Sequence, residues 1–145
     1  MIGIIVTGHG LFASGIEKAV ERIIGEQAQV AYVDFPIEIN TDMLNQQMLE
    51  AIKAVNDGSG ILFFTDLLGG TPFRTAALIA QEQTGIEVLT GTNLQMTLEI
   101  MLERDCENTT LEGFREMALA CGHRGLTSLY DQQKIKSKKV VEDGI

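Results

Sequence analysis

Short apolar runs alternate with segments of helical periodicity through most of this chain. Residues 2–7, 30–35, 60–65 and 86–90 have the length and apolar content of buried strands. Between them, apolar residues recur every three or four positions, which is typical of helices packed against a sheet. The alternation predicts βαβ units, and therefore a parallel sheet whose strands are connected by helices.

The predicted fold class is α/β. We expect an open, doubly wound sheet of four parallel strands, in the order 2-1-3-4, flanked by helices. A single domain over residues 1–130 agrees with the chain length of 145 residues. Residues 126–130 could add one further strand. The remainder, 131–145, is expected to be a polar tail with too little apolar surface to fold independently.

Several helices have recognisable start signals. Thr41 is predicted to cap the helix that follows the second strand, and Thr71 to cap the helix that continues with Pro72. Thr109 and Glu112 have the spacing of a capping box, which predicts the start of another helix. These caps determine where the loops between strands and helices end.

The composition excludes some classes of function. The net charge is −9, with 20 acidic and 11 basic residues, so a nucleic-acid partner is not expected. No apolar stretch reaches the roughly 20 residues of a membrane helix, and a strand follows Met1 directly. We therefore expect a soluble, cytoplasmic protein. Cys106 and Cys121 lack the spacing of metal ligands and are expected to be packed thiols, and neither a metal nor a cofactor is predicted.

Two polar residues follow neighbouring strands of the predicted sheet. His9 comes after the first strand and Asp66 after the third. In an open parallel sheet, ligands bind at the carboxyl ends of the strands where the strand order reverses, which here is between strands one and three. A carboxylate beside an imidazole fixes its tautomer and supports a positive charge on the ring. His9 and Asp66 are therefore the predicted catalytic pair, although either residue alone could belong to an ordinary loop.

The segment after Asp66 suggests a phosphate site. Gly69 and Gly70 lead into the helix that starts near Thr71, where backbone N–H groups can bind an anion and the hydroxyl adds a donor. Phosphoryl transfer requires this kind of alignment and charge stabilisation. The same residues could instead form only a tight turn and a helix cap. His123 follows a helix end and is not included in the predicted site.

The motifs resemble one family closely. Gly8-His9-Gly10 and the sequence TDLLGGTPF at 65–73 resemble the mannose-family EIIA domain of the bacterial sugar phosphotransferase system, and the resemblance extends over nearly the whole chain. The stretches HGLFASG at 9–15, GTNL at 91–94 and CGHRGL at 121–126 resemble the branch that serves N-acetylgalactosamine or galactosamine.

The resemblance implies a function for the predicted site. His9 would accept a phosphoryl group from the phosphocarrier HPr and pass it to EIIB, which would be a separate protein, with membrane subunits EIIC and EIID acting further along. Asp66 would orient His9, and Thr71 would lie beside the phosphate where relatives have serine. The domain would form a homodimer in which a strand at 126–130 is exchanged between subunits.

Three alternative functions follow from the same residues. The phosphohistidine subunit of dihydroxyacetone kinases shares the fold and the histidine, although the Gly-Gly-Thr-Pro segment at 69–72 favours the sugar-transport branch. A non-catalytic anion-binding or regulatory module would use His9 only for contact. A phosphatase with a histidine nucleophile would need additional cationic groups around the phosphate.

Overall fold

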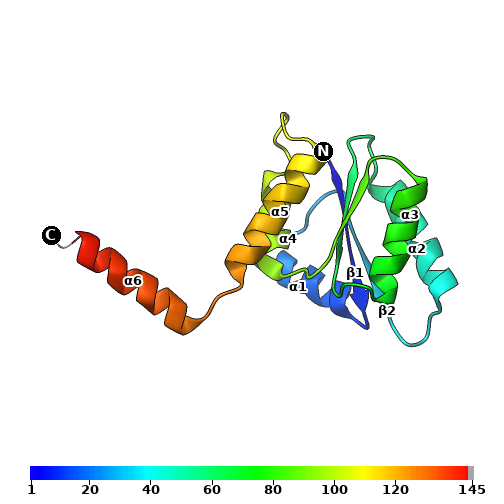
Figure 1. Ribbon diagram of the computed structural model, residues 1–145. Coiled ribbons are helices and arrows are strands. Elements are labelled where there is room, and N and C mark those ends of the chain that lie inside the picture. The colour runs from blue at the N-terminus through cyan, green and yellow to red at the C-terminus, as the bar shows by residue number, and fades with distance from the viewer. Residues whose placement is uncertain (144–145) are drawn as a thin grey trace.

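The protein contains one parallel sheet between two layers of helices (Figure 1). The computed structural model describes the backbone of residues 1–143 and the side chains of residues 1–138. The strands are β1 (Gly3–His9), β2 (Val30–Phe35), β3 (Ile61–Thr65) and β4 (Ile86–Leu89). They pair in parallel in the order β2-β1-β3-β4, which confirms the predicted α/β class and the 2-1-3-4 order.

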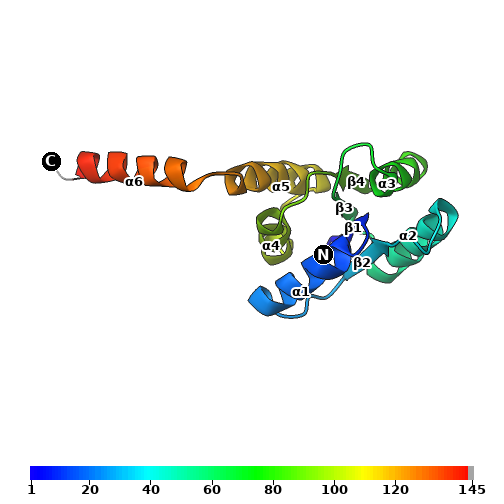
Figure 2. The same ribbon diagram turned by 90° about the horizontal axis from the view of Figure 1, so that it is seen from below.

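The helices lie on both faces of this sheet. They are α1 (Phe12–Ile24), α2 (Thr41–Val55), α3 (Thr71–Glu82), α4 (Leu94–Glu103), α5 (Leu111–Gly125) and α6 (Leu129–Asp143). Figure 2, which looks at the molecule from below, shows α1, α4 and α5 on one side of the sheet and α2 and α3 on the other. Within the described residues, no helix combines the length and the apolar character needed to cross a bilayer.

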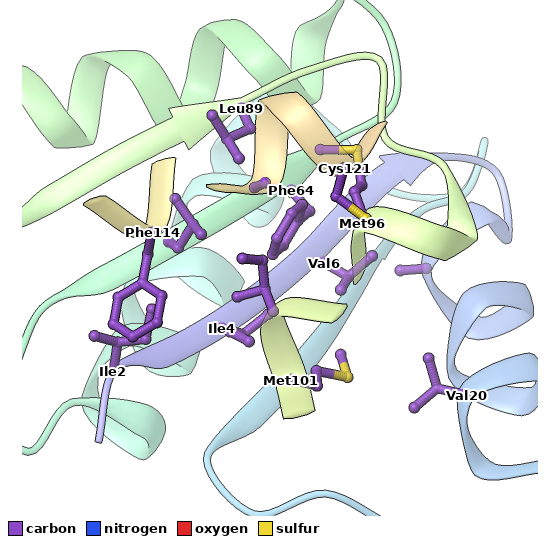
Figure 3. Close-up of a cluster of buried hydrophobic side chains, with 14 residues drawn as sticks. Ile2, Ile4, Val6, Val20, Phe64, Leu89, Met96, Met101, Phe114 and Cys121 are labelled. Carbon is purple, nitrogen blue, oxygen red and sulfur yellow. The ribbon is translucent and has the colours of Figure 1, made fainter. Parts of the chain in front are cut away.

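The alternation of side chains along β1 connects two apolar cores. Ile4 and Val6 face the core formed with α1, α4 and α5 (Figure 3), whereas Ile5 faces the core formed with α2 and α3. All three are fully buried. Because side chains two residues apart point to the same face of a strand, His9 continues the row of Ile5 toward α2 and α3. The core packing of β1 therefore sets the direction of the His9 side chain.

The structure corrects three predicted helix caps. Asn40, not Thr41, caps α2 and accepts the Met43 N–H at 2.9 Å. Thr110, not Thr109, caps α5 by accepting the Gly113 N–H at 3.0 Å. Gly70, not Thr71, precedes the first helical residue of α3. An N-cap is the last residue with extended backbone, and Thr41 and Thr71 already lie within their helices.

The additional strand predicted at 126–130 is not present in the described chain. Residues 126–128 form a link after α5, and Leu129 begins α6. Ser128 accepts the Asp131 N–H at 3.0 Å, as an N-cap does, so the local signal is that of a helix. The polar tail predicted to begin at residue 131 is helical as far as residue 143, as part of α6, and this helix extends away from the body in both views (Figures 1 and 2).

Candidate active site

The structure brings His9 and Asp66 together. β1 and β3 are paired with Thr7 opposite Thr65, so the residues that follow the two strands meet at one edge of the sheet. The Asp66 Oδ2 atom lies 2.8 Å from the His9 ring atom Nδ1 and also accepts the His9 backbone N–H at 2.8 Å. The other carboxylate oxygen accepts the Leu67 N–H at 2.8 Å. Three contacts therefore fix the carboxylate beside the ring.

These contacts determine the ionisation of Asp66 and the tautomer of His9. Partial burial alone raises the pKa of the Asp66 carboxyl group, but the hydrogen bonds from His9 and Leu67 outweigh it, so the pKa lies below its ordinary value of 3.8. Asp66 is therefore ionised at neutral pH and accepts the proton on Nδ1. The lone pair of a neutral His9 ring then lies on Nε2.

Exposure distinguishes the two side chains. The side chain of His9 is 46% exposed, whereas that of Asp66 is 16% exposed. The carboxylate is shielded behind the ring, and the ring remains accessible from outside. Such an arrangement presents the imidazole to a reaction partner and keeps the orienting group away from it.

Two glycines make room for this pair. A Cβ atom on Gly70 would come within 2.6 Å of His9 Cε1 and 3.3 Å of Nε2, so Nε2 lies against the start of α3. A Cβ atom on Gly8 would come within 2.5 Å of the Phe12 ring and 2.9 Å of Asp66 Cγ. The backbone of Gly70 is in an ordinary extended conformation, with φ −70° and ψ 165°, so its requirement for glycine is one of space.

The start of α3 supplies donors next to Nε2. Gly70 donates its N–H to the Leu67 carbonyl at 3.1 Å, which forms the turn that leads into the helix. In the first turn of α3, the N–H groups of Thr71 and Phe73 have no acceptor within the helix, and Pro72 has no N–H. Because Gly70 and not Thr71 is the N-cap of α3, the Thr71 hydroxyl is not needed to accept a helix N–H.

The carboxyl end of β2 contributes to the site, which sequence reasoning missed. Gly10 and Phe35 exchange two backbone hydrogen bonds, at 2.8 and 3.1 Å, and the Phe35 ring meets the His9 ring edge-on with centroids 6.1 Å apart. The Asp34 carboxylate accepts the Ser14 N–H at 2.9 Å and its hydroxyl hydrogen, and so caps α1 from a neighbouring strand. The predicted strand order places β2 beside β1, and this was the sequence signal that could have indicated a contribution from β2 to the site.

The loop after β4 supports Asp66 from the other side. Gly91 donates its N–H to the Asp66 carbonyl at 3.2 Å. Thr92 donates both its N–H, at 3.2 Å, and its hydroxyl, at 2.7 Å, to the Thr65 carbonyl. These hydrogen bonds fix the backbone of Thr65 and Asp66, and therefore the position of the Asp66 carboxylate.

The remaining chemistry-bearing residues lie outside this arrangement. Cys121 is buried, as expected for a packed thiol, but Cys106 is exposed, so that prediction was wrong for one of the two cysteines. His123, together with Met96 and Leu119, lines a separate pocket that has a volume of about 320 Å³. Among residues whose placement is described, no three His, Cys, Asp or Glu side chains are grouped as metal ligands.

The fold and this pair define an α/β protein that presents an imidazole at the switch point of a parallel sheet. The chain belongs to the EIIA-man family of the sugar phosphotransferase system (PTS), whose family model, described as PTS system fructose IIA component, matches residues 3–119. EIIA components are phosphotransfer proteins in sugar transport. The family predicted from the motifs is thus confirmed, whereas the N-acetylgalactosamine branch stays a prediction.

Individual relatives agree with this assignment. The chain is 31% identical over 134 residues to the Escherichia coli (strain K12) protein YadI, covering 92% of this chain and 90% of YadI. It is 29% identical over 128 residues to the mannose-specific EIIAB component of the same strain, covering 88% of this chain and 39% of that protein.

A solved structure has the same fold. The chain is similar to the phosphotransferase system component EIIA from Streptococcus agalactiae, with a TM-score of 0.83 and 31% identity, covering 90% of this chain and 99% of that one.

Proposed function

We propose that His9 accepts a phosphoryl group from HPr and passes it to an EIIB component. The observation that carries the proposal is the contact between His9 and Asp66. Asp66 Oδ2 lies 2.8 Å from His9 Nδ1 and accepts its proton, and 46% of the His9 side chain remains exposed. The ring thus has a fixed tautomer, an accessible lone pair and an anion placed to support a positive charge.

The transfer needs no other covalent group on this chain. The Nε2 lone pair of His9 forms a bond to phosphorus while the bond from phosphorus to the donor's histidine nitrogen breaks, and that electron pair returns to the donor ring. The His9 ring becomes a phosphorylated imidazolium that retains its Nδ1 proton. The negative charge of Asp66 stabilises this state. Transfer to EIIB is the same step with His9 as the leaving group.

The start of α3 is proposed to bind the phosphoryl oxygens. Gly70 lies against His9 Cε1 and Nε2, and the N–H groups of the first turn follow directly. The positive end of the helix dipole favours an anion there. Gly69 and Gly70 provide the turn that allows this approach, and the Thr71 hydroxyl is proposed as an additional donor.

The surroundings of His9 support a protein as the partner. Leu11, Leu67 and Leu68 follow the two site residues in sequence and are 69%, 61% and 72% exposed. Apolar side chains exposed around a polar centre are typical of surfaces that other proteins cover. A phosphoprotein donor would cover these three leucines when its histidine approaches Nε2. A protein acceptor would cover the same leucines when its acceptor group approaches Nε2.

The remaining parts of the proposal follow from the family. EIIB would deliver the phosphoryl group to incoming sugar through the membrane subunits EIIC and EIID. The stretches at 9–15, 91–94 and 121–126 support N-acetylgalactosamine, galactosamine or a mannose-type sugar as the substrate. We also propose that the chain forms a homodimer.

Intact-mass spectrometry tests the proposal. The protein is incubated with enzyme I, HPr and phosphoenolpyruvate and measured under mildly alkaline conditions, and a single acid-labile phosphoryl group is expected. His9→Ala should abolish the addition. His123→Ala is the matched control, because it removes the only other histidine of the chain, and it should still be phosphorylated. No addition to the wild-type protein in the presence of active HPr would favour an anion-binding module.

A further inference from the structure

Arg74 occupies an unusual position for a cation. It closes the first turn of α3, and among the described helices only α3 has a basic residue within its first four positions. The N-terminus of a helix carries a partial positive charge, so a cation there destabilises the helix. The first turn of α3 contains no acidic residue to offset this effect. Arg74 is therefore unfavourable for its own helix until a negative group binds nearby, and a local conflict of this kind is typical of a functional site.

The guanidinium group of Arg74 is not used to hold the fold together. The residue is exposed, and it forms no ion pair within the part of the chain that the structure describes. In contrast, Arg115 and Arg124 each pair with a glutamate, and Arg104 donates to backbone carbonyls. The charge of Arg74 is thus left for a group outside the described chain.

Helical geometry directs Arg74 toward the His9 ring. Arg74 donates its backbone N–H to the Gly70 carbonyl at 2.9 Å, so the two residues lie one helical turn apart on nearly the same face. That face meets the ring, since a Cβ atom on Gly70 would lie 3.3 Å from His9 Nε2. Side chains on a helix slant toward its N-terminus, and an arginine side chain is long enough to span one turn of about 5.4 Å. The guanidinium group can therefore reach a phosphoryl group on Nε2.

A pocket beside the site gives the guanidinium group room to move. The pocket has a volume of about 240 Å³ and lies between α2 and α3, which cover the face of the sheet toward which His9 points (Figure 2). Its lining is mainly hydroxyl-bearing and contains no acidic residue; it consists of Thr41, Thr71, Arg74, Thr75 and Leu78. Because Thr71 also begins α3, the pocket opens next to the position of the phosphoryl group.

We propose that Arg74 is a further catalytic residue, which binds the phosphoryl oxygens on His9 through its guanidinium group. Two N–H groups on one edge of the guanidinium donate to two of these oxygens. The oxygens carry negative charge in the transition state and in the phosphorylated protein, so Arg74 stabilises both. Arg74 neither gains nor loses a proton in the transfer, and the bonds to phosphorus form and break at histidine nitrogens as described above. This inference rests on the proposed function and adds a cation to its site.

The phosphoryl exchange equilibrium with HPr tests the role of Arg74. Full-length wild type, Arg74→Gln and Arg74→Lys are each mixed with phosphorylated HPr, and intact-mass spectrometry under mildly alkaline conditions measures the fraction of each phosphoprotein. Arg74→Gln should lower the equilibrium constant for transfer to this chain at least about tenfold, because a charge-assisted pair of hydrogen bonds is lost. Arg74→Lys keeps the charge without the two-pronged contact and should give an intermediate value.

Arg22→Gln is the matched control. It removes the same charge from an exposed arginine in the last turn of α1, at the opposite end of the sheet from the His9 site, and it should leave the equilibrium constant unchanged. An equal fall in Arg22→Gln would assign the effect to net charge and overturn the proposal.

An equilibrium constant also separates phosphoryl binding from docking of the partner. Weaker docking slows the forward and reverse transfers by the same factor, whereas loss of a contact with the phosphoryl group shifts their ratio. Slower exchange in Arg74→Gln with an unchanged equilibrium constant would therefore overturn the proposal and assign Arg74 to docking.

The wild-type measurement keeps this inference distinct from the proposed function. Normal phosphorylation of the wild type, with an unchanged equilibrium constant in Arg74→Gln, would contradict only the role of Arg74. Absence of phosphorylation in the wild type, with HPr shown to be active, would contradict the phosphocarrier function and the role of Arg74 together.

Discussion

The two ends of the parallel sheet each hold one charged side chain surrounded by backbone groups. At the carboxyl end, Asp66 accepts N–H groups from His9 and Leu67 and contacts the His9 ring. At the amino end, Arg104 donates to the carbonyls of Ile2, Ala28 and Gln29. Both charges are thus compensated mainly by fixed backbone dipoles.

The difference lies in what each charge leaves accessible. Arg104 is 3% exposed, and burial lowers the pKa of its guanidinium group. It connects the residues that precede β1 and β2 with the end of α4 and presents nothing to solvent. Asp66 instead holds a ring that is 46% exposed. The comparison separates a charge that the fold encloses from one that orients an accessible ring.

Asp66→Asn should give the largest effect. The amide cannot stabilise the positive charge on His9, so the rate of phosphoryl transfer should fall on the order of 10³-fold while the fold is retained. Rapid-quench measurements with phosphorylated HPr check this. Asp57→Asn is the control, because Asp57 contacts the amino terminus at 2.9 Å, far from His9, and its loss should leave the rate unchanged. A wild-type rate in Asp66→Asn would remove Asp66 from the mechanism.

Arg104→Met should show the opposite pattern. The carbonyls of Ala28 and Gln29 would lose their buried donors, so we expect a loss of about 3 kcal/mol in the free energy of unfolding. Denaturant titration measures this loss. In the folded fraction, the rate of phosphoryl transfer should equal that of the wild type. A slower transfer with unchanged stability would mean that the two ends of the sheet are not separate in function.

Gly70→Ala should affect transfer more than stability. The new methyl group would displace the His9 ring from its position against α3, since the Cβ atom would lie 2.6 Å from Cε1. We expect transfer to slow about tenfold. Gly15→Ala on α1 is the matched control, because its Cβ atom meets no atom within 4 Å, and it should transfer normally. Equal rates in both variants would show that the ring tolerates displacement.

The smallest effect concerns pH. The pKa of Asp66 in the folded state lies below its ordinary value of 3.8, so its ionised form stabilises the fold above that pH. This contribution is lost as the pH falls through the folded-state value. The difference in unfolding free energy between wild type and Asp66→Asn should therefore shrink below about pH 4. A difference that stays constant down to pH 3 would contradict the hydrogen-bonded geometry.

The sequence predicted the central part of the site because its determinants are regular. Apolar runs and helical spacing define the strands, and the strand order places the ends of β1 and β3 together, so the meeting of His9 and Asp66 was predictable. Gly69 and Gly70 were predicted in the adjacent loop for the same reason. Predicting that these residues lie together did not require knowledge of any contact between particular atoms.

The remainder depends on choices that short patterns do not determine. Two neighbouring residues could each cap a helix at Asn40 and Thr41, and again at Thr109 and Thr110, and the backbone conformation decides between them. The contact of Phe35 with His9 joins residues from different strands. Helix α6 was missed because its few apolar residues do not form a face within its own chain.

The exposure of the His9 ring has a consequence for timing. A phosphoryl group on Nε2 would stand in contact with solvent, where water competes with the acceptor protein for the same bond. The useful lifetime of the charged intermediate would then be governed by how soon the next carrier arrives. A half-open site of this kind suits rapid relay between successive proteins better than long storage of the group.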